Sequence, residues 1–349
     1  MSWDIVTTDR TEFEKAAKLA GKELRGLTYR DAIKEALYQM MEKDDRVIVM
    51  GEGVDHYGWI FGTTAGLLEK FGAQRVFDTP IAENSMTGIA IGLSLAGMRP
   101  IFVHMRNDFL LLAMDQMVNH AAKWKYMTGG KVGVPIVIRA IIGRGWGSAA
   151  QHSQSFQAYF MHTPGLKVVI PSSPYDVKGL LISSIEDKDP VVFIEARLIY
   201  EHIGYVPEEI YTVPLGKGTI RKEGKDITII AVSYMVFESI KAAEELEKEG
   251  ISVEVIDPRT IKPLDEEIIF ESVKKTGRAV IADTGWLTCG ITAEISARIS
   301  EKMFKYLKAP ILRIALPDTP TPASPILEKA FYPDKKKIIS AVKKVLGSK

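Results

Sequence analysis

The sequence predicts an α/β protein built from two doubly wound domains. Short, mostly apolar runs alternate with amphipathic helical stretches, which is typical of parallel sheets covered by helices on both faces. This alternation stops in one proline-containing stretch, residues 204–217, and then resumes. The 349 residues are enough for two domains with separate cores.

The first domain is expected to span residues 27–203, after a polar and partly helical arm at residues 1–26. Thr28 is a plausible N-cap because Asp31 follows three residues later and a helical stripe of apolar side chains comes next. The expected strands are Val47–Met50, Ile101–Val103, Pro135–Ile138, Lys167–Ile170 and Val191–Ile194. The expected helices lie around 84–97, 108–126, 154–161 and 174–186.

The second, smaller domain is expected at residues 218–349, after a linker at 204–217. The same alternation supports it. Its expected strands are Ile227–Val232, Ser252–Ile256, Ala279–Ala282 and Ile311–Ile314. Its expected helices are 236–249, 264–275 and 291–303.

Composition excludes several classes of protein. A net charge of +1 argues against a nucleic-acid or membrane-surface protein. The single cysteine, Cys289, allows no intramolecular disulfide and fits a reducing compartment. The charged N-terminus does not read as a secretory signal, and no apolar run reaches the roughly 18 residues of a membrane span. We therefore expect a cytoplasmic location.

Ligands in open parallel sheets bind beyond the carboxyl ends of the strands, so the turns that follow strands are the places to search. Glu83 stands just before a predicted helix rich in small residues. Either the helix dipole favours this carboxylate, or the carboxylate is buried and hydrogen-bonds a heterocycle nitrogen. Gly88, Gly92 and Gly97 suggest that another backbone approaches this helix closely, for example between subunits.

A glycine-rich stretch, residues 143–154, ends in His152 beside hydroxyl and amide side chains. An imidazole with a near-neutral pKa can donate or accept a proton, although a histidine can also simply cap the next helix. Glu52 ends the first strand and either faces a cleft or is solvated. Tyr57 belongs to a polar-aromatic cluster that either packs on a flat ring or covers the core. His104 and Arg106 follow a strand, where they either meet a charged substrate or form ion pairs.

Seven segments together resemble the beta subunits of 2-oxo acid dehydrogenases, namely the pyruvate, acetoin and branched-chain members. The likeness runs from about Thr28 to the C-terminus. Several matches in the right order are far more specific than any single motif. The segments are GEGVDHYG, FDTPIAE, TGIAIGLSLAGMRPI, DQMVNHAAKWKYMTGG, AAQHSQS, PGLKVVIPSSPYDVKGLL and VIDPRTIKPLD.

The resemblance implies a transketolase-like pyrimidine-binding domain followed by a transketolase C-terminal-like domain. It implies oxidative decarboxylation of a 2-oxo acid with thiamine diphosphate, followed by acyl transfer to a lipoyl carrier. Glu83 matches the glutamate that bonds the aminopyrimidine ring and favours the tautomer that activates the cofactor. His152 matches a histidine that donates a proton or orients groups during acyl transfer. Glu52, Tyr57 and Phe109 match further cofactor-binding positions.

The resemblance also implies partners and ions. The GDG pattern with a downstream Asn, which holds Mg²⁺ and the diphosphate in thiamine enzymes, is absent, so a separate alpha subunit is expected to hold both. A two-alpha, two-beta heterotetramer docked on a lipoyl acyltransferase core follows from this. A potassium site seen in some members matches Ile136, Ser184, Ile185, Asp187 and Asp189.

The sequence departs from the family where the substrate is expected. Residues 103–107 and 139–146 differ from the common patterns, and the changes add His104, Arg106 and Arg144. These side chains either favour a more anionic or polar substrate or pair with acids. Two other functions stay open: thiamine-dependent acyl or ketol transfer to a non-lipoyl acceptor, and a non-catalytic assembly subunit.

Overall fold

The computed structural model describes residues 6–19, 21, 24–56, 60–144 and 147–347. The contacts between Cα atoms divide the chain into two compact units. The first unit consists of Met1–Ile142 and Tyr159–Leu215, and the second of Gly143–Ala158 and Gly216–Lys349. The segment 143–158, which lies inside the range expected for the first domain, therefore groups with the second unit. The prediction of two doubly wound α/β domains is confirmed.

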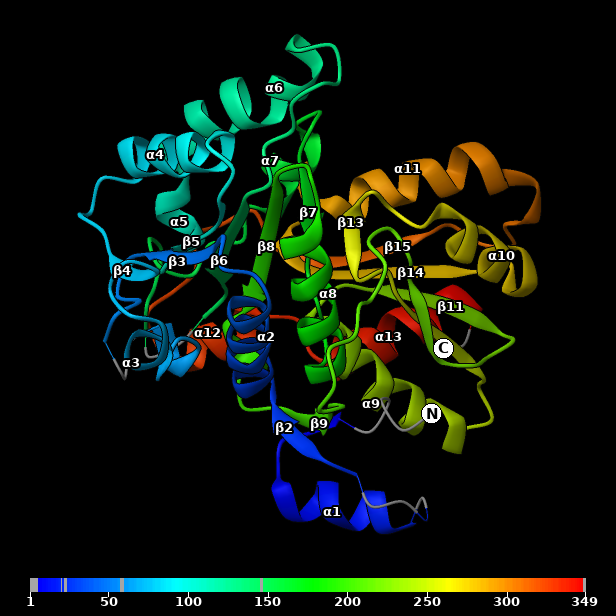
Figure 1. The fold of residues 1–349 in the computed structure, drawn as a ribbon. Helices are drawn as coiled ribbons and strands as arrows, with labels where there is room; N and C mark the ends of the chain where they lie inside the picture. The colour runs from blue at the N-terminus through cyan, green and yellow to red at the C-terminus, as the bar shows by residue number, and fades with distance from the viewer. Residues whose placement is uncertain (1–5, 20, 22–23, 57–59, 145–146, 348–349) are drawn as a thin grey trace. The chain divides into compact units, whose positions relative to one another are not determined.

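The first unit is built on six parallel strands in the spatial order β7-β8-β6-β5-β3-β4 (Figure 1). Every residue of β3, β6 and β8 is buried, as expected for a parallel sheet with both faces covered. The short strand β4 carries one exposed and one half-buried residue and was not predicted. The strands are β3 (Val47–Gly51), β4 (Val76–Asp78), β5 (Arg99–His104), β6 (Val137–Ile142), β7 (Lys167–Val169) and β8 (Val191–Ala196).

Helices cover this sheet, and α2 packs against α8. Thr28 caps α2 by accepting the Asp31 N–H at 3.0 Å, which confirms the predicted cap. The helices are α2 (Tyr29–Lys43), α3 (Leu67–Phe71), α4 (Glu83–Leu95), α5 (Asn107–Leu110), α6 (Ala122–Met127), α7 (Gln157–His162) and α8 (Pro174–Glu186).

The single helix expected at 108–126 is instead a chain of short helices with different hydrogen-bond spacing. A 3₁₀ turn, η3 (Leu111–Ala113), and a π-helical stretch, η4 (Gln116–Ala121), separate α5 from α6. Apolar periodicity does not distinguish these variants, because all of them repeat every three to five residues. Further 3₁₀ turns in the described chain are η2 (Ile60–Gly62), η5 (Arg197–Ile199) and η6 (Phe304–Tyr306).

A small antiparallel sheet in the order β1-β9-β2 joins the N-terminal arm to the end of the first unit. Its strands are β1 (Val6–Thr7), β2 (Gly26–Thr28) and β9 (Ile203–Tyr205), and β9 extends into the stretch expected as a linker. The arm also contains α1 (Arg10–Leu19), which buries Phe13 and Ala17.

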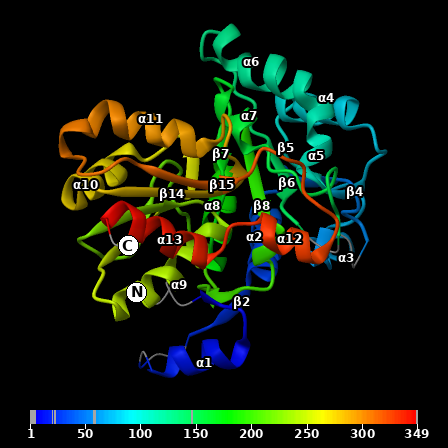
Figure 2. The ribbon, with the colours of Figure 1, turned by 180° about the vertical axis from the view of Figure 1, so that it is seen from behind.

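The second unit has a five-stranded sheet in the order β10-β12-β11-β14-β15, parallel except for the edge strand β10. Its strands are β10 (Thr219–Lys222), β11 (Ile227–Ala231), β12 (Val253–Asp257), β14 (Ala279–Trp286) and β15 (Leu312–Leu316), and a short strand, β13 (Thr260–Lys262), follows β12 in the chain. Its helices are α9 (Tyr234–Lys248), α10 (Glu266–Thr276), α11 (Ile291–Met303), α12 (Pro325–Phe331) and α13 (Lys335–Leu346) (Figure 2).

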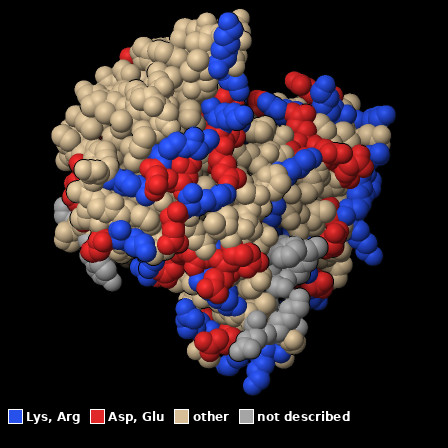
Figure 3. Space-filling model, viewed as in Figure 1, with Lys and Arg blue, Asp and Glu red and all other residues tan. Residues whose placement is uncertain are grey.

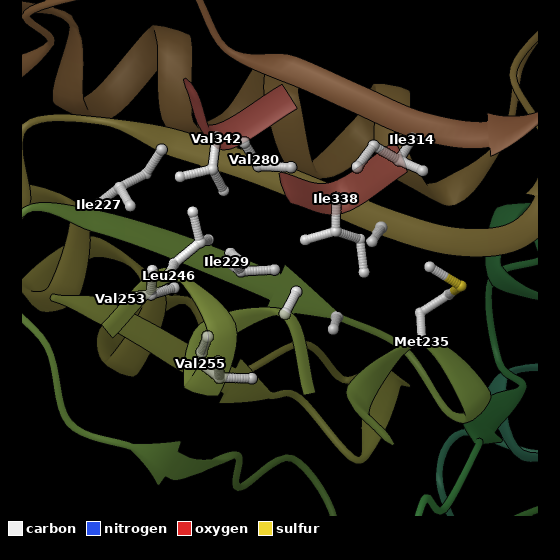
Figure 4. Close-up of a cluster of buried hydrophobic side chains, with 14 of the residues drawn as sticks. Ile227, Ile229, Met235, Leu246, Val253, Val255, Val280, Ile314, Ile338 and Val342 are labelled. Carbon is white, nitrogen blue, oxygen red and sulfur yellow. The ribbon is translucent and has the colours of Figure 1, made fainter. Parts of the chain in front are cut away.

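Alternate strand residues of this sheet enter two separate apolar cores. Ile229 and Val280 pack with Ile338 and Val342 of α13 on one face (Figure 4). The opposite face packs against α10 and α11 in a second cluster. Among the described residues, no helix has the length and apolar character needed to cross a bilayer.

Candidate functional site

An acidic corner forms in the first unit at the carboxyl ends of β3, β4 and β5. Gly51, the last residue of β3, has φ 147°, and a Cβ atom there would lie 2.2 Å from the Val103 carbonyl oxygen. Only glycine permits this approach. The Glu52 N–H then donates to Val103 O at 3.1 Å, and the Asp78 carboxylate accepts the N–H groups of Gly53 and Val54. The backbone of this turn therefore fixes the position of Glu52.

Glu83 is the first residue of α4 and is 6% exposed. The partial positive charge of a helix N-terminus favours a carboxylate at this position. No hydrogen bond joins its carboxylate to any residue that the structure describes. A buried carboxylate without a protein donor is suited to accept hydrogen bonds from a bound molecule.

Glu52 lies within electrostatic range of Glu83. Burial, the charge of Glu83 and, to a smaller extent, the charge of Asp78 raise the pKa of Glu52 from 4.5 to about 7, although a hydrogen bond from the Met105 backbone opposes this rise. Its buried Oε1 atom has no hydrogen-bond partner within the described part of the chain. Near neutral pH the Glu52 carboxyl is therefore partly protonated.

Three other predicted residues lie along the same stretch of chain. Phe109 is half-buried on the short helix α5, and Arg106 is buried directly before that helix. His104 is completely buried, with its ring centroid 4.4 Å from that of Phe102. Neither ring nitrogen has a hydrogen-bond partner among the residues that the structure describes, and burial lowers the pKa of His104 to about 3. A neutral imidazole packed in the interior supplies no charge for an anionic substrate. Tyr57 lies outside the described residues.

His152 and Arg144 lie in the segment 143–158 of the second unit. His152 is exposed in an irregular stretch. The Arg144 guanidinium lies 3.6 Å from the Glu328 carboxylate and 5.0 Å from the centre of the Tyr332 ring. The positive charge of Arg144 is therefore paired with Glu328 in the same unit, which agrees with the expectation that Arg144 pairs with an acid.

A buried polar pair in this unit was not predicted. The Gln157 side-chain amide donates to the two carboxylate oxygens of Asp283 at 3.0 and 3.2 Å, and both residues are almost fully buried. Burial raises the pKa of Asp283 to about 6, although hydrogen bonds from Gly285, Gln157 and Thr284 oppose this rise. Asp283 directly follows the predicted strand Ala279–Ala282, so the rule that ligands bind at the carboxyl ends of strands would have identified it in the second domain.

The residues expected at a potassium site already have partners. The carbonyl oxygens of Ile185 and Asp187 accept hydrogen bonds from the Arg99 guanidinium at 2.7 and 3.0 Å. The Asp187 carboxylate is 2.6 Å from Lys167 Nζ, and the Asp189 carboxylate is 2.8 Å from Lys125 Nζ.

The other two expected ligands are also engaged. Ile136 O accepts the Val191 N–H at 3.0 Å, and the Ser184 hydroxyl donates to Leu180 O at 2.7 Å. Basic side chains thus pair with the two aspartates of this set. No cluster of three or more acidic, histidine or cysteine side chains suited to a metal occurs in the described parts of the chain.

Two family models match the chain, one to each domain. Residues 25–202 match the transketolase pyrimidine-binding domain, and residues 216–338 match the transketolase C-terminal domain.

Characterised relatives are similar over almost their whole length. The beta subunit of acetoin:2,6-dichlorophenolindophenol oxidoreductase from Bacillus subtilis is 45% identical over 93% of this chain and 98% of its own. The pyruvate dehydrogenase E1 beta subunit of Rickettsia bellii is 46% identical, and the 2-oxoisovalerate dehydrogenase beta subunit of Bacillus subtilis is 44% identical. Each of these two alignments covers 91% of this chain and 98% of the relative.

A solved structure gives the same result at the level of the fold. A split-gene transketolase, described as an inactive beta4 tetramer, superposes with a TM-score of 0.75 at 25% identity and covers 93% of this chain and 99% of its own. The two domain matches and the relatives agree. The chain therefore belongs to the family of beta subunits of the decarboxylating E1 components of 2-oxo acid dehydrogenases.

Proposed function

We propose that this chain supplies the pyrimidine-binding half of a thiamine diphosphate site, with Glu83 as the carboxylate that engages the cofactor ring. The complete enzyme would decarboxylate a 2-oxo acid oxidatively and pass the acyl group to a lipoyl carrier. The observation that carries this proposal is the Glu83 carboxylate, which is buried at the start of α4 and accepts no hydrogen bond from the described residues.

The hydrogen-bonding groups of the acidic corner fit an aminopyrimidine ring. Glu83 would accept a hydrogen bond from a protonated ring nitrogen, and the half-buried Phe109 ring would supply an apolar surface for a flat ligand. Glu52, with a pKa of about 7 and an unpartnered buried oxygen, would hold or release a proton beside Glu83. Tyr57 joins this set on the resemblance alone. When bound, thiamine diphosphate supplies an electron sink for the carbanion left after decarboxylation.

His152 is assigned to the acyl-transfer step. Its imidazole is exposed on a segment that contains glycine and other small residues, where it can reach a flexible acyl acceptor. It would donate a proton to the departing or accepting group, or orient that group. Arg106 remains a candidate for contact with the substrate, whereas Arg144 is paired with Glu328 and the burial of His104 assigns that residue to packing.

An alpha subunit would hold the diphosphate and Mg²⁺, in a two-alpha, two-beta assembly that docks on an acyltransferase core. The missing GDG pattern supports this division. A broad surface over α4 is almost free of charged side chains (Figure 3). Ile89 of α4, Ile81 just before this helix in the chain and Leu112 of η3 are 51%, 83% and 62% exposed. Exposed apolar surface of this kind is typical of protein interfaces.

The test is reconstitution of the chain with its alpha subunit and assay with an artificial electron acceptor. Glu83→Gln should reduce turnover by at least about 100-fold, the usual contribution of a positioned proton-transfer group, while the variant still co-purifies with the alpha subunit. The exposed Glu69→Gln is the matched control and should retain activity. Full turnover by the Glu83 variant would refute the assignment.

The substrate and acceptor are tested separately. A panel of pyruvate, branched-chain 2-oxo acids and acetoin should be assayed both with dichlorophenolindophenol and with lipoamide. Acetoin belongs in the panel because a close relative is named for it. Decarboxylation that never reduces lipoamide, but yields a condensation product with an added aldehyde, would favour the transferase alternative. His152→Ala should impair lipoamide acylation more than decarboxylation.

A further inference from the structure

The segment that carries His152 is held within the second unit by several contacts. The Tyr332 hydroxyl donates to Ser153 O at 3.3 Å, and the rings of Phe156 and Trp286 lie 5.6 Å apart. Next along the chain, Gln157 begins α7 with its side chain bonded to Asp283 of β14. Residues that follow His152 are therefore tied to the C-terminal part of the chain.

We infer that Gln157 and Asp283 are positioning residues, a buried amide–carboxylate pair that anchors the His152 segment to β14 and sets where the imidazole stands. This inference rests on the acyl-transfer role proposed for His152. The two residues are 1% and 2% exposed, so their hydrogen bonds do not compete with solvent. Loss of either partner leaves the other buried and unsatisfied.

The backbone at Gly285 leaves room for the Gln157–Asp283 pair. Gly285 donates its N–H to Asp283 Oδ2 at 2.9 Å. A Cβ atom at Gly285 would lie 2.6 Å from that same oxygen and 3.1 Å from Gln157 Nε2. A residue with a side chain at position 285 would therefore push the two partners apart. The pair thus depends on close packing of three residues from two distant stretches of the sequence.

The Gln157–Asp283 pair differs in burial and charge from two other contacts that hold the segment. The contact between Arg144 and Glu328 is longer, at 3.6 Å, and both of its side chains are partly solvated. The phenol–carbonyl bond of Tyr332 is neutral, whereas Asp283 gives charge-assisted bonds when it is ionised. The burial that raises the pKa of Asp283 to about 6 still leaves it mostly ionised above that pH. Loss of the Gln157 side chain should therefore loosen the segment.

Moving the carboxylate from position 283 to position 157 tests the inference. Gln157→Glu sets a second carboxylate against Asp283, and Asp283→Asn then restores a carboxylate–amide pair of the same shape in reverse order. The surface change Gln74→Glu serves as the control. Each variant is assembled with the alpha subunit and measured by hydrogen–deuterium exchange of residues 147–158, by the rate of decarboxylation, and by the rate of lipoamide acylation between pH 5.5 and 8.

Gln157→Glu should expose the segment to exchange and slow lipoamide acylation about tenfold or more, with a smaller effect on decarboxylation and partial recovery at low pH, where one carboxylate is protonated. The double variant should restore both protection and the transfer rate. Unchanged exchange and transfer in Gln157→Glu, or a double variant no better than the single one, would overturn the anchoring role. If His152→Ala leaves transfer intact while the exchange results follow this pattern, the role proposed for His152 fails and the anchor stands.

Discussion

Glu83 and Glu52 come from different turns of the first unit, and the charge of Glu83 helps to raise the pKa of Glu52 to about 7. Neither acid has an ion-pair partner among the described residues. The folded chain therefore keeps two carboxyl groups close together without neutralising them, an arrangement found more often at functional sites than in structural cores.

This pair makes stability depend on pH in a defined direction. The folded-state pKa of Glu52 lies above its ordinary value of 4.5, so the folded chain binds a proton more tightly than the unfolded chain does. The free energy of unfolding should therefore fall as the pH rises from about 4.5 to about 7. Glu52→Gln removes this loss and should stabilise the chain at pH 8 by about 1–3 kcal/mol, with little effect at pH 5.

Urea unfolding of the wild type and of Glu52→Gln at both pH values measures the difference. The exposed Glu69→Gln should show no such pH-dependent gain. An equal change at pH 5 and pH 8 would mean that ionisation of Glu52 is not the cause.

A buried ion pair supports the sheet of the first unit. Arg139 and Glu195 are 1% and 0% exposed, with two hydrogen bonds of 2.5 and 2.9 Å between them, and the Tyr200 hydroxyl donates to Glu195 at 2.6 Å. Glu195→Gln leaves the Arg139 charge buried and should lower the free energy of unfolding by about 3–5 kcal/mol. Tyr200→Phe should cost only about 1 kcal/mol. Equilibrium denaturation compares them, and similar losses would contradict the dominance of the charged pair.

Gly92 tests the exposed face of α4. It lies in the helix interior with open space where a Cβ would stand. Gly92→Ala should therefore stabilise the isolated chain by about 0.5–1 kcal/mol through helix propensity. Gly92→Leu should weaken association with the alpha subunit if this face is covered in the complex.

Ser300→Leu is the matched enlargement on an exposed position of α11. Calorimetric titration of each variant with the alpha subunit measures the two affinities. Equal affinity for the Gly92 and Ser300 variants would place the interface elsewhere.

Nine strands of the two sheets were predictable because they are mostly apolar runs, and α2 was predictable because it carries both a cap and a stripe, whereas the edge strand β10 was not predicted. Strand β4 was not predictable, since Val76–Asp78 is too short to show a period. The broken helix between Asn107 and Met127 was missed because α, 3₁₀ and π turns share nearly the same apolar spacing.

The candidate site could be predicted only at single positions, where a residue of a suitable type stands at a strand end or at the start of a helix. The sequence placed Glu52 at a strand end and Glu83 at the start of a helix, but it did not show the effect of Glu83 on the ionisation of Glu52, which depends on how far apart the turns fold. The charge expected at His104 disappears on burial, which sequence alone does not report. Gln157 and Asp283 stand 126 positions apart, and no local pattern links them.

The chain passes from one unit to the other three times, after Ile142, Ala158 and Leu215. Hybrids of related subunits that exchange halves at a single junction near residue 215 would therefore pair the 143–158 stretch of one parent with the β14 and α12 of another. An active hybrid should therefore need residues 143–158 and 216–349 from the same parent. A gene fused only near residue 215 would join the His152 segment of one subunit to the rest of the second unit of another.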